Sequence, residues 1–293
     1  MTSLPTQFHG LKTVVIVGVG LIGGSIAAAL KSRGFRGKIV GVGRDRKRLA
    51  DAQSAGLVDV GTLDLAEAAA DADLFVFCTP VDRIAAGVHE AARWCRTGTL
   101  ITDTGSVKGS ICHALSSGLP GGATFIGSHP LAGSERQGFE HADADLFEGR
   151  VCVVTPDVDT PAEPLRHLES FWQSMGCAVV KLSAADHDRA LAETSHLPHA
   201  VAAALAATLS PGNRQLAASG FCDTTRVAAG DPDLWTAILL ANSDEMAERL
   251  SAFGDKLDEF AAAIAKRDEA VLKRLLQQAK TARESVDCRG RTD

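Results

Sequence analysis

Short runs of apolar, β-branched residues alternate with longer amphipathic stretches through the first 183 residues of the chain. The first run, Lys12–Val17 (KTVVIV), has the composition of a strand buried on both faces of a parallel sheet. Similar runs follow at Lys38–Val42, Leu74–Cys78, Thr99–Thr102, Ala123–Ile126, Arg150–Thr155 and Cys177–Leu182. Stretches with helical periodicity, such as Leu63–Ala72 and Pro164–Met175, separate most of them. This alternation predicts an α/β fold with a doubly wound sheet.

From about Ala184 the strand-like runs stop, and alanine and leucine dominate the remaining residues. Such a stretch is typical of packed helices. The sequence therefore predicts two domains, an α/β domain over residues 1–183 and an all-helical domain over residues 184–293. The helices offer more apolar surface than one small domain easily buries, which predicts a homodimer with most of its contact in the second domain.

Composition and charge narrow the classes of partner. Of the 293 residues, 45% are hydrophobic and 23% charged, and the net charge is −6 with no long basic run, so neither nucleic acid nor an anionic membrane is expected as a partner. Seven cysteines without CxxC spacing indicate reduced thiols in a cytoplasmic protein, without a disulfide framework or metal site. The apolar stretch Val14–Leu30 is shorter than the roughly 20 residues a spanning helix needs, and it contains four glycines.

Those glycines form the first candidate binding motif. Directly after the first predicted strand, Gly18, Gly20 and Gly23 stand in G-x-G-x-x-G spacing, and a helix-like stretch follows. In a dinucleotide-binding domain the first glycine permits a tight turn and the second lets a pyrophosphate approach the backbone. The third lets the helix pack closely on the strand, while the helix N-terminus faces the phosphates. The motif predicts a Rossmann-type dinucleotide site.

The residues after the second predicted strand bear on the choice of cofactor. NAD-binding domains usually carry an acid about 20 residues beyond the last glycine, where it binds the ribose hydroxyls. Here that position is Gly43, and Arg44 follows it. A guanidinium without an adjacent carboxylate suits a 2′-phosphate, so NADP is favoured over NAD. Asp45 offers the alternative, because its carboxylate would suit ribose hydroxyls.

Chemistry-bearing residues follow other predicted strands. His129, in the stretch GSHPLAGSE, precedes a proline, which disfavours a helical conformation for the histidine. We therefore expect His129 on an exposed turn at the end of a strand. Thr79 and Ser106 also follow predicted strands, and ligands of doubly wound sheets gather beyond the carboxyl ends of the strands. The loops bearing these three residues are expected to converge on one rim.

The helical half contributes further candidates. In SHLPH, Pro198 is expected to start or kink a helix, and His196 and His199 share roughly one face at i, i+3 spacing. Arg226 follows among turn-forming residues. On spacing alone, a histidine in an alanine-rich helix is more often a satisfied core residue than a functional one, and Arg226 is more typical of a structural ion pair.

Taken together, these motifs resemble a known family. In chain order they are GVGLIGGS, CTPV, DTGSVK, GSHPLAGSE, SHLPH and GFCDTTRVA, spread from about residue 11 to about residue 280. The combination is similar to the prephenate and arogenate dehydrogenases of tyrosine biosynthesis. That resemblance implies a Rossmann domain followed by a helical substrate-binding and dimerisation domain. It also implies oxidative decarboxylation of a small-molecule substrate, with hydride transfer to NAD(P)+.

The resemblance assigns roles to the candidate residues. By this resemblance, His129 and Ser106 are the catalytic pair. His129 accepts the proton of the hydroxyl group on the substrate's ring, and Ser106 hydrogen-bonds the same hydroxyl group. The resemblance assigns substrate binding to Arg226, His199, Ser134, Glu135 and Trp235. The expected cofactor-binding residues are Gly18, Gly20, Leu21, Ile22, Gly23, Arg44, Thr79 and Pro80.

Two departures and two alternatives accompany this interpretation. Cys222 and Gly230 stand where some relatives have lysine and serine, in the segment associated with substrate side-chain binding and tyrosine feedback. This leaves prephenate and arogenate as alternative substrates.

One alternative function is that of a β-hydroxyacid dehydrogenase. Such an enzyme has a lysine early in its second domain, whereas Ala190–Leu209 contains none. The other is a non-catalytic NADP-sensing module, which requires the glycines but not His129, Ser106 and Arg226 together.

Overall fold

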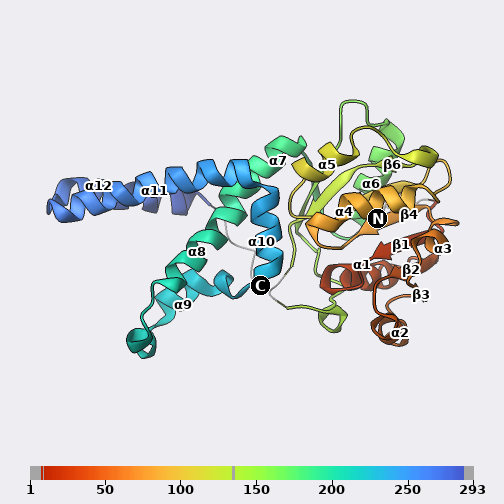
Figure 1. Ribbon diagram of the computed structural model, residues 1–293, viewed down its shortest axis with the longest axis horizontal. Coiled ribbons are helices and arrows are strands. Elements are labelled where there is room, and N and C mark those ends of the chain that lie inside the picture. The colour runs from red at the N-terminus through yellow and green to blue at the C-terminus, as the bar shows by residue number, and fades with distance from the viewer. Residues whose placement is uncertain (1–7, 9, 134–135, 287–293) are drawn as a thin grey trace, which may run out of the picture. The chain divides into compact units, whose positions relative to one another are not determined.

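The computed structural model describes residues 8, 10–133 and 136–286. The chain divides into two compact units, Met1–Asn242 and Ser243–Asp293. The first unit contains the whole α/β part and the helices that directly follow it (Figure 1). This division lies later in the chain than the change of composition near Ala184, so the boundary at 183/184 stays a prediction.

The core of the first unit is a six-stranded parallel sheet in the order β3-β2-β1-β4-β5-β6. Its strands are β1 (Thr13–Val17), β2 (Lys38–Val42), β3 (Val60–Thr62), β4 (Leu74–Phe77), β5 (Leu100–Asp103) and β6 (Thr124–Phe125). Side chains alternate across β1, because Val14 and Ile16 pack into one hydrophobic core and Val15 and Val17 into the other. The four consecutive apolar residues after Thr13 in β1 thus reflect burial on both faces.

Helices cover both faces of this sheet, as Figure 1 shows. They are α1 (Leu21–Ser32), α2 (Arg46–Ser54), α3 (Leu65–Ala69), α4 (Val81–Ala92), α5 (Gly109–Leu115) and α6 (Ala162–Ser174). Ile26 and Leu30 of α1 and Trp172 of α6 belong to one core, and Ile84 and Val88 of α4 to the other. The predicted Rossmann-type fold is confirmed.

The remaining strands form a second sheet rather than an extension of the first. It contains β7 (Gly127–Pro130), β8 (Val151–Thr155) and β9 (Ala178–Lys181), with β7 antiparallel to β8 and β8 parallel to β9. His129 lies within β7 opposite Val153, and it is buried. The prediction that His129 lies on an exposed turn is therefore wrong. The extended conformation that Pro130 favours in the preceding residue is used here for strand pairing.

A helical segment follows β9 within the same compact unit. It comprises α7 (Ala184–Leu191), a π-helical turn (Ala192–His196), α8 (Leu197–Ala207), α9 (Ser219–Thr225) and α10 (Pro232–Ala241). Pro198 lies in the first turn of α8, directly after the π-helical turn. Because the residues before it are already helical, it marks an irregularity within a continuous helical run and does not start a separate helix. Helix α10 packs against α4, and its Ile238 is buried in the second core. This packing joins α7–α10 to the sheet domain.

The second unit is a pair of helices, α11 (Ser243–Ala265) and α12 (Glu269–Ser285), which pack against each other. Asp268 caps α12 by accepting a hydrogen bond from the backbone N–H of Val271 at 3.0 Å. Large apolar side chains on these helices are exposed, namely Leu250, Leu257, Ile264 and Leu276. Within the described residues, no helix combines the length and apolar character that crossing a membrane requires.

Candidate active site

The glycine motif forms the turn between β1 and α1, and two of its glycines are sterically required. Gly18 has φ +94°, and a Cβ there would lie 2.7 Å from the carbonyl oxygen of Cys78. A Cβ on Gly23 would lie 2.2 Å from the carbonyl oxygen of Gly18. A Cβ on Gly20, in contrast, would meet no atom within 4 Å. The backbone at Gly20 is thus open to a ligand, as a pyrophosphate requires.

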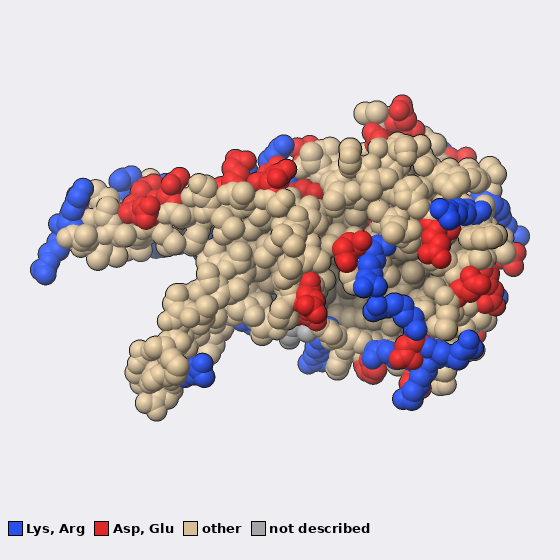
Figure 2. Space-filling model, viewed as in Figure 1, with Lys and Arg blue, Asp and Glu red and all other residues tan. Residues whose placement is uncertain are grey.

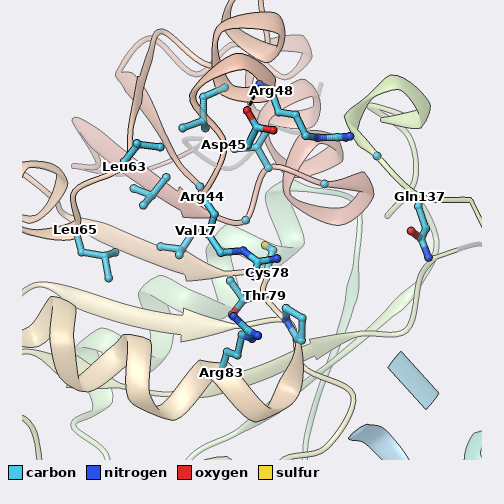
Figure 3. A pocket seen from close by; sticks show the side chains of 18 of the residues that line it. Val17, Arg44, Asp45, Arg48, Leu63, Leu65, Cys78, Thr79, Arg83 and Gln137 are labelled. Carbon is cyan, nitrogen blue, oxygen red and sulfur yellow. Dashed lines mark hydrogen bonds between the residues drawn. The ribbon is translucent and has the colours of Figure 1, made fainter. Parts of the chain in front are cut away.

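A cavity of about 1040 Å³ opens beside this turn (Figure 3). It is lined by residues from the ends of β1, β2 and β4, among them Gly18, Gly20, Arg44, Thr79 and Pro80. The hydroxyl oxygen of Thr79 is buried and has no hydrogen-bond partner among the described residues. A buried hydroxyl without a partner on a cavity wall is satisfied when a polar ligand fills the cavity. The cavity therefore fits a pyridine nucleotide.

Three of the expected cofactor residues do not line the cavity. Leu21, Ile22 and Gly23 form the first turn of α1 behind the loop. Their backbone N–H groups lie at the N-terminus of α1, the end of a helix that attracts phosphate, so their part in cofactor binding stays a prediction.

Basic side chains line part of the cavity. In Figure 3 the side chains of Arg44 and Arg83 approach each other around Thr79, the former from the end of β2 and the latter from α4. Figure 2 shows basic side chains along a hollow in this face, between the positions of α4 and α2. Asp45 lines the same cavity, but its Oδ1 caps α2 by accepting hydrogen bonds from the backbone N–H groups of Lys47 (2.8 Å) and Arg48 (3.2 Å).

A chain of hydrogen bonds runs from His129 into α7. Nδ1 of His129 lies 2.9 Å from Nε2 of His187, and Nδ1 of His187 lies 2.7 Å from Oδ1 of Asp188. The same carboxylate accepts hydrogen bonds from the backbone N–H groups of Lys108 and Gly109, each at 2.7 Å. His187 is fully buried. One ring nitrogen of His129 is thereby committed to the protein, whereas Nε2 has no partner among the described residues.

The surroundings of His129 favour its neutral form. Burial is the main cause that places the pKa of His129 well below its usual value, and the nearby His187, Lys108 and His196 lower it further. A neutral imidazole has an unshared electron pair at one nitrogen and can accept a proton there. The lowered pKa therefore favours the form of His129 that can accept a proton.

A buried ion pair holds β7 against the end of β5. The ammonium group of Lys108 pairs with the Asp103 carboxylate, and it donates a further hydrogen bond to the carbonyl oxygen of Ser128 at 3.0 Å. Asp103 also accepts hydrogen bonds from the backbone N–H groups of Gly105 (2.8 Å) and Ser128 (3.2 Å). The turn that carries Ser106 is therefore fixed to the strand that carries His129.

Asn242, at the end of α10, connects this chain to His196. Its amide nitrogen donates to the carbonyl oxygen of Asp188 at 3.0 Å and to Nδ1 of His196 at 3.2 Å. Burial lowers the pKa of His196 to about 4. Nε2 of His196 is buried and makes no hydrogen bond within the described chain, although the backbone of Ser106 lies near enough to affect the same pKa.

The predicted substrate-binding residues of the helical segment cluster beside His196. The rings of His199 and Trp235 stack with their centroids 3.4 Å apart, and Nδ1 of His199 lies 3.0 Å from the carbonyl oxygen of Ser195. Burial lowers the pKa of His199, and the charge of Arg226 contributes to this shift. His196 also meets the edge of Trp235, at a centroid distance of 6.3 Å. The structure thus brings His199, Trp235 and Arg226 together.

Two predicted residues, Ser134 and Glu135, lie outside the described residues. Ser106 is half-buried between β5 and α5, and its hydroxyl makes no hydrogen bond within the described chain. Sequence reasoning missed His187, Asp188, Asn242 and Arg83. The motif DHD at the start of the helical segment was the available signal for the first two, because charged residues and histidine are rarely buried without a partner.

Metal and thiol chemistry have no site here among the residues the structure describes. No three His, Cys, Asp or Glu side chains come together there as a metal ion would require. Cys78 lines the cavity, but burial raises the pKa of its thiol to about 12, so it stays protonated.

Comparisons with known proteins agree with this arrangement. The model of the prephenate dehydrogenase nucleotide-binding domain matches residues 26–181, and that of the prephenate dehydrogenase dimerization domain matches residues 183–278. A cyclohexadienyl dehydrogenase from Zymomonas mobilis is 34% identical over 93% of this chain and 95% of its own.

Two solved structures are similar over nearly the whole chain. One is a prephenate dehydrogenase from Aquifex aeolicus in complex with hydroxyphenyl propionate and NAD+, with a TM-score of 0.88, 32% identity, and coverage of 97% of this chain and 100% of that one. The other is an arogenate dehydrogenase from Synechocystis, with a TM-score of 0.79, 34% identity, and coverage of 93% and 99%. The chain belongs to the prephenate dehydrogenase family.

Proposed function

We propose that this protein oxidises and decarboxylates prephenate or arogenate with transfer of a hydride to NAD(P)+, in tyrosine biosynthesis. The observation that carries the proposal is the geometry at His129. Its Nδ1 is held by His187, its Nε2 is uncommitted within the described chain, and burial keeps the ring neutral. A non-catalytic nucleotide sensor needs the glycine loop but has no use for such a base.

The substrate chemistry explains why a base is required. Both substrates carry a hydroxyl on ring carbon C4 and a carboxylate on the opposite ring carbon. The hydride leaves C4 with its electron pair, and the hydroxyl proton passes to Nε2 of His129, which leaves a carbonyl at C4. The ring carboxylate then departs as carbon dioxide, and its bonding electrons aromatise the ring and leave a phenolate at the C4 oxygen. This oxygen regains the proton from His129, which returns the imidazole to its neutral form. The nicotinamide, when bound, supplies the hydride acceptor.

Ser106 and the Arg226 cluster orient the substrate in this proposal. Ser106 lies on the turn that the Lys108–Asp103 ion pair fixes to β7, which supports assigning its hydroxyl as the group that hydrogen-bonds the substrate hydroxyl. Arg226 binds a substrate carboxylate, because a guanidinium pairs with a carboxylate through two parallel hydrogen bonds. His199 and Trp235, stacked on each other, form the adjoining wall. Ser134 and Glu135 complete the cleft edge in this proposal.

We further propose NADP as the preferred cofactor. Arg44 and Arg83 place two positive charges at the cavity, where a 2′-phosphate would meet them. Gly43 provides no carboxylate at the position where NAD-binding domains usually have one. The alternative acid, Asp45, is engaged at the N-terminus of α2.

The cysteines support a cytoplasmic location. Cys78, Cys95, Cys112, Cys152, Cys177 and Cys222 are free thiols in the structure. Free thiols persist where the surroundings are reducing.

A homodimer through the helical part is proposed from the surface of α11. Leu250, Leu257 and Ile264 are exposed and recur every seven residues, which places them along one face of the helix. We expect Leu257→Asp to give a monomer in light scattering at micromolar concentration, because a charge on this face disfavours burial. Asp255→Ala, on the opposite face of α11, is the control and leaves the dimer intact. A wild-type monomer with full activity contradicts the proposal.

The activity is tested by following the reduced nicotinamide absorbance with prephenate and arogenate, each against NAD+ and NADP+. We expect turnover with at least one of the two substrates and a higher kcat/KM with NADP+. The four combinations also decide substrate preference, to which Cys222 and Gly230 are relevant. Absence of turnover in all four, with the nucleotide bound, would reject the proposed function.

A further inference from the structure

The positions of the protons on His129 follow from its contact with His187 and Asp188. The Asp188 carboxylate already accepts hydrogen bonds from two backbone N–H groups, those of Lys108 and Gly109. Nδ1 of His187 faces Oδ1 of this carboxylate at 2.7 Å, and only a protonated nitrogen is attracted there. In neutral His187 the proton is consequently on Nδ1, and Nε2 carries the unshared electron pair.

This tautomer determines the tautomer of the next ring. Nε2 of His187 lies 2.9 Å from Nδ1 of His129, and a hydrogen bond at this distance needs one proton between the two nitrogens. Because His187 Nε2 is the acceptor, His129 Nδ1 is the donor. The unshared pair of neutral His129 is then on Nε2, which is the nitrogen without a partner among the described residues.

We propose that Asp188 and His187 are positioning residues that fix the base tautomer of His129 and receive part of its positive charge. When Nε2 of His129 takes the hydroxyl proton, its Nδ1 proton can shift to Nε2 of His187, and the Nδ1 proton of His187 stays at Asp188. No proton is lost or gained in this exchange. The charge then lies beside the carboxylate. The catalytic part of this inference rests on the proposed function, whereas the tautomer assignment does not.

The charged groups around His129 and His187 favour proton transfer from His129 to His187. Lys108 and His196 lie near His129, and both act against a positive charge on its ring. Lys108 is itself paired with Asp103. Beyond His187, the Asp188 carboxylate is the nearest negative group in the chain of hydrogen bonds, and Asn242 binds the backbone carbonyl of the same residue at 3.0 Å. A positive charge is thus better accommodated at His187 than at His129.

The assignment is tested directly on the wild-type protein by ¹⁵N NMR of the histidine rings. The His129 signals are identified by their loss in His129→Asn. Above the pH at which the ring titrates, we expect His129 to be protonated on Nδ1 and unprotonated on Nε2. The opposite tautomer overturns the inference, and this measurement is independent of any activity.

Two variants test the catalytic part. Asp188→Asn removes the negative charge that favours a proton on His187 Nδ1 and a positive charge on that ring. We expect kcat to fall by roughly 10²–10⁴-fold, with the KM for the nucleotide nearly unchanged. His187→Gln keeps an oxygen that accepts from His129 Nδ1, so it should retain more turnover than His187→Leu, which offers no acceptor.

The matched control is Asp186→Asn on the same helix, since Asp186 pairs with Arg189 and does not contact the histidines. We expect its turnover to stay within about twofold of wild type. If folded Asp188→Asn loses no more turnover than this control, the proposed role of Asp188 and His187 in positioning His129 and sharing its charge is overturned. If Asp188→Asn fails to fold, the wild-type tautomer and the order of the two His187 variants decide the question.

Discussion

The cavity proposed for the cofactor and the proposed base, His129, are built from the chain in different ways. The glycine turn connects neighbouring elements, β1 and α1, and the loops beside it follow directly from β2 and β4. The base, in contrast, depends on residues far apart: His129 bonds a residue 58 positions away, and Asp188 bonds one 80 positions away. The first region depends on backbone geometry that a short motif specifies. The second depends on tertiary contacts of α7 with His129 of β7 and with Asn242 at the end of α10.

The two regions also differ in how exposed their charged groups are. The cavity is open and carries exposed arginines, so its contribution is attraction of a charged ligand. The base is buried with His187, Lys108 and Asp188, where each charge affects the next strongly. A substitution in the first region should therefore alter binding, and one in the second should alter turnover.

The largest effect is expected from His129→Asn. Asparagine keeps a hydrogen-bonding group but cannot accept the hydroxyl proton, so kcat should fall by roughly 10²–10⁴-fold. Nucleotide affinity, measured by fluorescence titration, should be nearly unchanged, because the glycine turn is separate. Wild-type turnover in this variant would show that His129 is only a structural residue and would remove the contrast between the two regions.

Arg226→Ala should affect the substrate more than the chemistry. It removes a charge-assisted contact worth roughly 1.5–3 kcal/mol, so the KM for the substrate should rise by about 10- to 100-fold, with a smaller change in kcat. Steady-state kinetics measure both. Arg214→Ala, elsewhere in the helical segment, is the control and should change neither constant. A loss confined to kcat would place Arg226 with the base instead.

Arg44→Ala should change the cofactor constants alone. If the guanidinium pairs with the 2′-phosphate, the KM for NADP+ should rise about tenfold, and that for NAD+ should barely move. Arg46→Ala is a matched control, because Arg46 begins α2 and is not among the residues that line the cavity. Equal effects on both nucleotides, or none on either, contradict the assignment.

The smallest effect concerns pH. Because burial lowers the pKa of His129, the neutral base persists below the usual histidine value of about 6.5, and the acidic limb of kcat/KM should lie below that value. Stability follows with a defined sign. The pKa of His196 is about 4 in the folded protein and about 6.5 in the unfolded chain. As pH falls from about 6.5 to about 4, the unfolded chain therefore binds a proton at His196 that the folded protein does not. The free energy of unfolding should decrease over this pH range. An acidic limb above 6.5 would contradict burial of the base.

The expected positions of individual residues show where sequence reasoning failed. Pro130 indicated an extended backbone at His129, which is right, but whether that backbone turns or pairs depends on β8, a strand more than 20 residues later. The side chains that orient His129 were missed because His187 and Asp188 are ordinary residues of an amphipathic helix until α7 packs beside β7. Trp235 and His199, predicted from resemblance, do lie together.

The sequence alone determined the parallel sheet, the glycine turn and the change to helices, because these depend on local periodicity and on backbone conformations that only glycine adopts easily. It also contained the motifs that identify the family. Only the tertiary structure decided that His129 is buried in a strand, that its Nδ1 is held by His187, and that Asn242, at the end of α10, bonds Asp188 and His196. The physical reason is the sequence separation of the residues involved. A hydrogen bond between buried side chains of distant elements depends on how those elements pack, and no short stretch of sequence specifies that packing.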